Sequence, residues 1–125
     1  EAGLARCLEL IKAGRFQPHR RTRLLEELEI NEKEGVAILK SAVHSKRLVR
    51  VTEDLYYAPE QTTEIITSLS KYLQDNQSIT VIQFKELLNI SRKYAIDLLE
   101  YFDSQHLTIR KDNQRVPGSI LASNE

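Results

Sequence analysis

Apolar residues in the first part of the chain recur every three or four positions, with polar residues between them. This spacing predicts amphipathic helices. The expected inward positions of three successive helices are Leu4, Leu8 and Ile11; Leu24, Leu25 and Leu28; and Val36, Leu39 and Val43. Gly14 is predicted to end the first helix, and Pro18 to open the second at its first position. Asn31 and Glu34 have the spacing of a capping box for the third.

Two short runs rich in β-branched and aromatic residues follow these helices. Residues 48–51 and 55–58 are predicted to form strands, joined by a polar turn at 52–54. Three helices followed by a two-stranded hairpin are typical of a winged helix-turn-helix.

The same order of elements then repeats, with an offset of about sixty residues. Pro59 is predicted to open a helix, and Thr80 with Gln83 forms another capping box. The inward positions are Ile66, Leu69 and Leu73; Phe84, Leu87 and Leu88; and Ala95, Leu98, Leu99 and Phe102. Asp112-Asn113 suits a tight turn between strands at 107–111 and 114–116. The repeat predicts a mainly α fold with small β-hairpins, in the α+β class, built from two tandem winged helix-turn-helix domains at residues 1–58 and 59–125.

Composition limits the classes of function. The 125 residues carry no formal net charge, which excludes a uniformly basic nucleic-acid coat but allows local patches. Cys7 is the single cysteine, so neither an internal disulfide nor a cysteine zinc site is expected. No apolar run reaches membrane-spanning length, no signal peptide is evident, and a cytoplasmic location is expected. Because the chain contains no Met, we expect it to be part of a longer protein.

The sequence offers little support for catalysis. His19, His44 and His106 lie in different predicted elements without a partner at a useful spacing. The glycines are scattered and form no phosphate-binding loop. We therefore predict no catalytic residues, no metal and no cofactor.

The start of the sixth predicted helix has the properties of an anion site. Ser91 is the expected N-cap, and the positive end of a helix favours anions. Arg92 and Lys93 add two cations there, and Tyr94 adds a ring on which an unpaired base could stack. The alternative is that both cations are ordinary solvated residues and that Tyr94 packs on the core.

The second hairpin adds a further basic group. If Asp112-Asn113 is the turn, Lys111 faces Gln114 and Arg110 faces Arg115. We expect Ile109 and Val116 to share the core side, which leaves Arg110 and Arg115 opposed on the outer side. Directly opposed like charges destabilise a strand pair, and a bound phosphate would relieve this cost. The alternative is that both side chains extend into water.

Acidic residues limit how a nucleic acid could approach. Asp97, Glu100 and Asp103 follow the first turn of the sixth helix. Contact through the helix start and the hairpin would avoid these carboxylates, which fits an RNA hairpin loop better than a regular duplex lying along the helix.

The first copy has its charges elsewhere. Its third helix begins with Asn31-Glu32-Lys33-Glu34, where two acids discourage a phosphate. Its basic residues are His19, Arg20, Arg21, Arg23, Lys46, Arg47 and Arg50. These could contact another part of a large partner such as ribosomal RNA. A solvated face with salt bridges to Glu26 and Glu27 is the alternative.

The second half also resembles a known family. The stretch 83–103, with its strings Ser-Arg-Lys-Tyr-Ala (91–95) and Leu-Leu-Glu-Tyr-Phe-Asp (98–103), is similar to the last winged-helix domain of bacterial selenocysteine-specific elongation factors. The hairpin end Arg-Val-Pro-Gly (115–118) adds to this similarity. The first half resembles the preceding winged helix of the family in position and pattern only.

The resemblance implies a specific role. The family's parent protein is a translational GTPase that delivers selenocysteyl-tRNA to a recoded UGA codon, and its C-terminal winged helices recognise a hairpin in the mRNA. This chain would then be a monomeric, non-enzymatic mRNA-binding part that works at the ribosome. The RNA-binding residues would be Ser91, Arg92, Lys93, Tyr94, Arg110, Lys111, Gln114 and Arg115.

Two other functions fit the same fold. A winged helix can regulate transcription by binding duplex DNA, usually as a dimer. It can also serve as a protein-interaction module, which predicts an exposed apolar patch. Tyr56 and Tyr57 are the candidates for such a patch, although packing between the two modules is the simpler interpretation.

Overall fold

The computed structural model describes residues 2–122. The chain forms two compact units, the first ending at Thr63 and the second beginning at Glu64. This boundary falls inside helix α4 (Pro59–Asn76), which begins at the predicted Pro59. Both units combine helices with a small antiparallel sheet, in the order expected for a winged-helix α+β fold.

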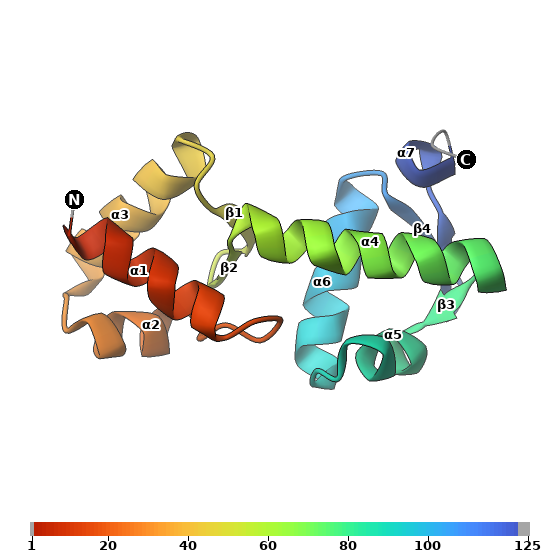
Figure 1. Cartoon of the computed structure of the whole chain (residues 1–125), viewed down its shortest axis with the longest axis horizontal. Helices are drawn as coiled ribbons and strands as arrows, with labels where there is room; N and C mark the ends of the chain where they lie inside the picture. Colours follow the sequence, from red (N-terminus) through yellow and green to blue (C-terminus); the bar gives the residue numbers. More distant parts are fainter. Residues whose placement is uncertain (1, 123–125) are drawn as a thin grey trace. The chain divides into compact units, whose positions relative to one another are not determined.

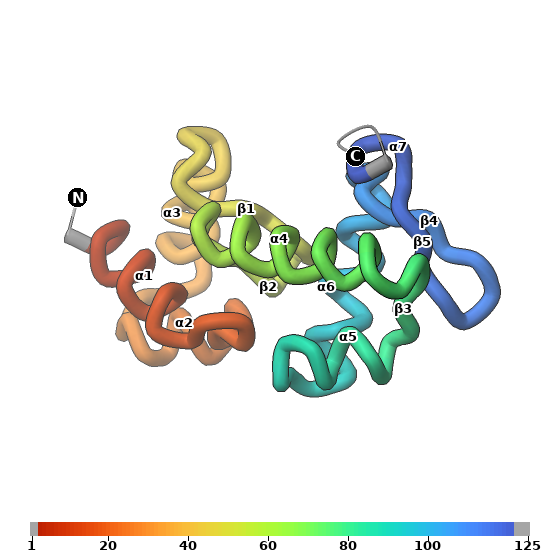
Figure 2. The backbone as a smooth tube through the Cα atoms, turned by 45° about the vertical axis from the view of Figure 1, so that its right-hand side comes forward, coloured from red at the N-terminus to blue at the C-terminus, as the bar shows by residue number. Residues whose placement is uncertain are grey.

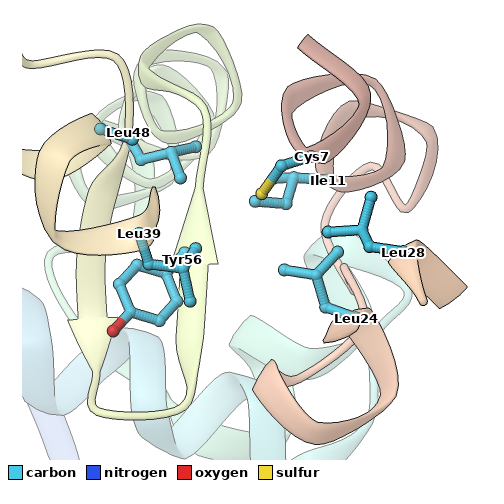
Figure 3. Packing of buried hydrophobic residues seen from close by; sticks show 8 residues of the cluster. Cys7, Ile11, Leu24, Leu28, Leu39, Leu48 and Tyr56 are labelled. Carbon is cyan, nitrogen blue, oxygen red and sulfur yellow. The ribbon is translucent and has the colours of Figure 1, made fainter. Parts of the chain in front are cut away.

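The first unit is a helix-turn-helix followed by a hairpin (Figure 1). Its elements are α1 (Ala2–Ala13), α2 (Arg21–Leu28), α3 (Glu32–His44), β1 (Val49–Thr52) and β2 (Leu55–Tyr57). The buried core contains Cys7, Ile11, Leu24, Leu28, Leu39, Leu48 and Tyr56, contributed by all three helices, the hairpin and the segment before it (Figure 3). Tyr56 and Tyr57 are both buried, so they do not form an exposed apolar patch.

The buried side-chain amide of Gln61 links the start of α4 to the end of α1. Gln61 is 7% exposed, and its Oε1 accepts a hydrogen bond from the Ala58 N–H at 2.7 Å. Its Nε2 donates to the carbonyl of Ile11 at 2.9 Å and to that of Arg15 at 2.6 Å. One side chain therefore binds the Ile11 carbonyl in the last turn of α1 and the Arg15 carbonyl just after the helix, in a region where helix geometry leaves acceptors without intrahelical partners.

The second unit repeats this plan and adds a strand. After the part of α4 that belongs to this unit, its elements are β3 (Ile79–Thr80), α5 (Val81–Leu88), α6 (Arg92–Ser104), β4 (Thr108–Lys111), β5 (Gln114–Pro117) and α7 (Ser119–Ala122). The strands form one antiparallel sheet in the order β3-β5-β4. Figure 2 shows the β4–β5 hairpin as a blue loop at the edge of this unit. Phe84 and Phe102 pack edge to face in the core, with ring centroids 6.3 Å apart.

The two helix-turn-helix segments share their local geometry. Glu29 and Asn89 end α2 and α5 in the left-handed conformation, each with φ 56°. Asn31 and Ser91 then cap the following helices by accepting a hydrogen bond from a backbone N–H. The predicted capping box at Thr80 is confirmed, since the side chain of Gln83 accepts from the Thr80 backbone N–H in return. Equal geometry at equivalent positions supports the internal repeat.

The beginning of α2 differs from the prediction. Pro18 does not open this helix, which begins at Arg21. Pro18 is buried in the preceding loop, where the Gln17 N–H donates to the Gly14 carbonyl at 2.9 Å. Proline is compatible with a first helical position but is equally favoured in turns, so its presence alone does not place the start of a helix.

Three inward positions also differ from the prediction. Val36 in α3 is only partly buried and is not among the residues that pack against the core of the first unit. Ile65 is fully buried in α4, whereas Ile66 is only partly buried. Leu87 in α5 is 38% exposed. Adjacent helical residues point about 100° apart. The sequence alone therefore does not show which member of the apolar pair 65–66 faces the core.

Candidate nucleic-acid interface

The start of α6 places two cations beside a helix N-terminus. Ser91 has extended backbone angles and accepts a hydrogen bond from the Tyr94 N–H at 3.5 Å. Arg92 and Lys93 follow it and are both exposed, while Tyr94 is partly buried. The first turn contains these cations in place of acids, so the positive end of the helix dipole and the side chains favour the same anionic ligand.

The second hairpin has the predicted register. Ile109 pairs with Val116, Arg110 with Arg115, and Lys111 with Gln114. The turn is formed by Asp112 and Asn113, and Asp112 has φ 58°. A tight turn with a left-handed residue is what the Asp-Asn pair predicted.

The predicted faces of this hairpin are wrong. Arg115 is 4% exposed, and Ile109 is 48% exposed. Arg115 forms an ion pair with Asp103, with Nη2 2.9 Å from Oδ2. An aspartate on α6 thus makes burial of an arginine acceptable, so Arg115 and the buried Thr108 occupy the face expected for Ile109.

Despite this reversal, the helix start and the hairpin share one groove of about 570 Å³. Arg92 lines it from the first turn of α6, and Arg110 and Arg115 line it from the hairpin. The remaining lining residues are Thr80, Val81, Ile82, Ile96, Glu100 and Asn113. The structure thus brings together arginines that lie far apart in the sequence, which is the central prediction for this surface.

Charge in the groove is predominantly positive. Three arginines face one glutamate, so the lining has a formal charge of +2. Arg115 is neutralised by Asp103, and the Arg110 Nε donates to the Asp112 carbonyl at 3.1 Å. Within residues 2–122, neither Arg92 nor Arg110 forms an ion pair. These two guanidinium groups can therefore bind an external anion without first breaking a salt bridge.

The other predicted RNA-binding residues do not line this groove. Four of them are exposed and lie on the same helix start or the same hairpin as the groove residues: Ser91, Lys93, Lys111 and Gln114. Tyr94 is partly buried. Contact by these residues with RNA therefore stays a prediction.

Sequence reasoning missed the apolar part of the groove. Ile82 is 59% exposed in the first turn of α5, and Ile96 is partly buried on α6. Both line the groove. Ile82 lies outside the apolar stripe of its helix. A large apolar side chain at a position expected to face solvent could have indicated a binding surface there.

The first unit has a groove of its own, of about 450 Å³. It is lined by Arg21, Val36, Lys40, Val43, His44, Arg50, Glu53 and Tyr56. Arg21 contacts Glu32 at 3.5 Å and Arg50 contacts Glu53 at 3.7 Å. Two of its cations are thus already matched by carboxylates of the same unit.

Other kinds of site receive no support from the described residues. Among residues 2–122, the structure contains no group of three or more His, Cys, Asp or Glu side chains placed to hold a metal ion. The same residues include no helix that is both long and apolar enough to cross a membrane. Burial raises the pKa of the Cys7 thiol to about 11, so this cysteine is protonated at neutral pH and is a core residue.

The fold and this groove place the protein among winged-helix proteins with a basic surface at the helix start and the wing. A family model described as elongation factor SelB, winged helix, matches residues 71–116. The selenocysteine-specific elongation factor of Desulfomicrobium baculatum is 29% identical over 117 residues, which cover 92% of this chain and 18% of that protein. Its counterpart in Escherichia coli (strain K12) is 27% identical over 98 residues, covering 78% of this chain and 16% of that protein.

Solved structures agree with this relationship. A bacterial selenocysteine-specific elongation factor matches 94% of this chain with a TM-score of 0.74 and 28% identity, and the match covers 18% of its length. The mRNA-binding domain of Escherichia coli elongation factor SelB, solved with SECIS RNA, matches with a TM-score of 0.81 and 22% identity, covering 94% of this chain and 98% of that domain. The chain is thus similar to the winged-helix region of selenocysteine-specific elongation factors, and the resemblance predicted from its sequence is confirmed.

Proposed function

We propose that this chain is the mRNA-binding part of a selenocysteine-specific translation elongation factor. Its second unit recognises the selenocysteine insertion hairpin through the groove between α6 and the β4–β5 hairpin. The observation that carries this proposal is that Arg92 and Arg110 line one groove and neither forms an ion pair within residues 2–122. Their charge is therefore directed at an external anion.

Phosphate contacts supply affinity in this mechanism. A guanidinium group presents a planar fork that matches two phosphate oxygens, and Arg92 from α6 and Arg110 from the hairpin offer two such forks in one groove. Lys93 and Lys111 follow them in the sequence and are exposed outside the groove lining, where they add positive charge to its surroundings. Binding should weaken as salt increases, because neutralising phosphates releases counterions.

Base contacts supply selectivity. Ile82 and Ile96 give the groove an apolar surface, and Asn113 and Thr80 add polar groups that can donate or accept hydrogen bonds. A base that is splayed out of a hairpin loop offers both a flat face and free edges. Tyr94 and Gln114 are placed at the helix start and the hairpin to extend these contacts.

The acid in the groove favours a compact RNA. Glu100 lies two helical turns beyond Arg92 on α6 and also lines the groove. A regular duplex lying along α6 would bring its phosphates towards this carboxylate. An RNA loop bound in the groove can keep its phosphates at Arg92 and Arg110 and turn a base edge that carries hydrogen-bond donors towards Glu100. This arrangement favours RNA hairpin recognition over duplex DNA reading.

The rest of the proposal concerns the parent protein. The chain spans 18% and 16% of the length of the two curated relatives, so GTP hydrolysis and tRNA delivery belong to other parts of such a factor. This part acts as a monomeric, non-enzymatic RNA-binding region in the cytoplasm. The first unit is the candidate for contact with the ribosome.

A binding titration with the parent organism's insertion hairpin tests the proposal. We expect Arg92→Ala to weaken binding at least about tenfold, or ~1.4 kcal/mol. Lys71→Gln is the matched control, because Lys71 is an exposed cation on α4 outside the groove lining. A loop-mutated hairpin should bind more weakly than the natural one.

Two results would contradict this function. One is unchanged affinity in a correctly folded Arg92→Ala variant. The other is displacement of the hairpin by an equal concentration of duplex DNA, which would favour a transcription regulator instead.

A further inference from the structure

A single carboxylate in the second unit joins α6 to both strands of the hairpin. Asp103 lies in the last turn of α6. Its Oδ1 accepts from the Thr108 hydroxyl at 2.6 Å. Its Oδ2 accepts from Arg115 Nε at 3.3 Å and from Arg115 Nη2 at 2.9 Å. Thr108 begins β4 and Arg115 lies in β5, so one side chain fixes two strands on one helix.

Arg115 and Thr108 in this cluster are buried, and Asp103 is partly buried. The side chains of Arg115 and Asp103 are 4% and 25% exposed, and Thr108 is 1% exposed. A buried ion pair is weak evidence for a role in stability alone, since well-packed apolar residues can often replace such a pair without loss. The Nε and Nη2 contacts together fix the orientation of the Arg115 side chain relative to α6, because the planar guanidinium must lie with one edge against the Asp103 carboxylate.

Arg115 connects the hairpin to α6, to the neighbouring strands and to the groove. It is the strand partner of Arg110 in β4 and of Ile79 in β3, and it lines the groove itself. Any change in how Arg115 sits on α6 therefore moves Arg110 and Asn113 relative to Arg92. The separation of these groups decides whether one RNA loop can reach all of them.

We propose that Asp103 is a positioning residue for RNA recognition, acting through Arg115 and Thr108 to fix the β4–β5 hairpin at the distance that the RNA loop requires. This inference rests on the proposed function of the groove. Arg115 then contributes geometry rather than a phosphate contact. Its guanidinium group is ion-paired with Asp103, whereas Arg92 and Arg110 form no ion pair within residues 2–122.

The test is a double variant, Asp103→Asn with Arg115→Gln, in the full chain. It removes both charges together, so neither is left buried without a partner, and a melting curve checks that it folds. The readouts are its affinity for the insertion hairpin and for the loop-mutated hairpin at several salt concentrations. Lys71→Gln again serves as the matched control.

We expect the folded double variant to bind the hairpin about fivefold more weakly or worse and to lose part of its preference over the loop mutant. The slope of log affinity against log salt should stay unchanged. If Arg115 instead contacts a phosphate, the slope should fall by about 0.7–0.9, and the positioning role is refuted. Unchanged affinity and preference would show that the pair serves only the fold.

Arg115→Lys provides a second measurement that does not depend on the double variant. Lysine keeps the positive charge but cannot form the two-point contact with Asp103, so we expect the same loss of preference between the hairpins. Full binding by this variant would overturn the proposal. If the unaltered chain itself failed to prefer the hairpin over its loop mutant, the proposed function would fall and this inference with it.

Discussion

The two helix-turn-helix segments of this chain have the same backbone geometry but opposite charges at the start of the last helix. α3 begins with Glu32 and Glu34 in its first turn, and the Glu34 carboxylate accepts from the Asn31 side-chain amide at 3.2 Å. α6 begins with Arg92 and Lys93. In the first unit, the helix dipole is thus matched by carboxylates of the protein itself, whereas in the second it adds to a cationic surface.

The hairpins differ in how they are held. The first is two-stranded, and its register shifts between Arg50 and Thr52. Its turn residue Asp54 contacts Arg20 at 3.2 Å. The second belongs to a three-stranded sheet with regular pairing and is joined to α6 by Asp103. A regular, fixed hairpin is suited to present Arg110 at a defined place.

The comparison shows that one fold can carry two different surfaces without change in its core plan. Caps, the left-handed turn and the apolar positions repeat, because they are needed for folding. Charges at the helix start and along the hairpin do not repeat, because the fold does not require them. The asymmetry of the charges is the basis for proposing that the second unit is the one that binds RNA.

Charge reversal in the groove of the second unit gives the largest expected effect on binding. The double variant Arg92→Glu, Arg110→Glu should weaken hairpin binding by at least about 100-fold, or ~2.7 kcal/mol, because two phosphate contacts become repulsive. The matched variant Lys40→Glu, Arg50→Glu changes the same number of charges in the groove of the first unit. It should cost less than about threefold, or ~0.6 kcal/mol, in the same titration.

Equal losses in the two double variants would contradict the proposal that only the second unit binds the hairpin. They would mean that both units bind the hairpin directly, and that the acids at the start of α3 do not prevent contact with RNA. Circular dichroism of each variant is needed to show that folding is intact.

Much of the fold could be predicted from the sequence, and the reasons are local. The capping box at Thr80 depends on residues three positions apart, and the register of the second hairpin follows from the Asp112-Asn113 turn. Such signals involve neighbouring residues whose geometry is nearly independent of the rest of the protein. The convergence of Arg92 and Arg110 then follows from the order of elements in a winged helix.

The burial of Arg115 could not be predicted in this way. Alternation along β4 and β5 shows which residues share a face, but it does not show which face is inside. Apolar Ile109 and Val116 favoured the wrong answer. The deciding partner, Asp103, lies on α6, and only the packed structure shows that its carboxylate meets Arg115 Nη2 at 2.9 Å. Tertiary pairing thus overrode the apolar pattern.

The hydrogen bonds of the Gln61 side chain lie within the first unit, so their loss should lower the stability of that unit alone. Gln61→Ala should destabilise the first unit by about 1–3 kcal/mol, because the Ala58 N–H and the Arg15 carbonyl lose their partner and the Ile11 carbonyl keeps only the Gly14 N–H. Hydrogen exchange of amides in α2 and α3 measures this loss, while amides of α5 and α6 should keep their protection. Gln74→Ala is the control, since Gln74 is an exposed residue of the same helix and should cost less than about 0.5 kcal/mol. An equal loss of protection in α5 and α6 would show that the amide stabilises more than the first unit.

The smallest expected effect compares the two left-handed turns. Glu29 and Asn89 both have φ 56°, a conformation that is unfavourable for most side chains and tolerated by asparagine. Glu29→Gly should therefore stabilise the first unit by about 0.5–1 kcal/mol, despite the greater freedom of glycine in the unfolded chain. Asn89→Gly should change the second unit by less than about 0.5 kcal/mol, measured by the same exchange experiment. A larger gain at Asn89 than at Glu29 would mean that contacts of the asparagine side chain, rather than backbone strain, distinguish the two turns.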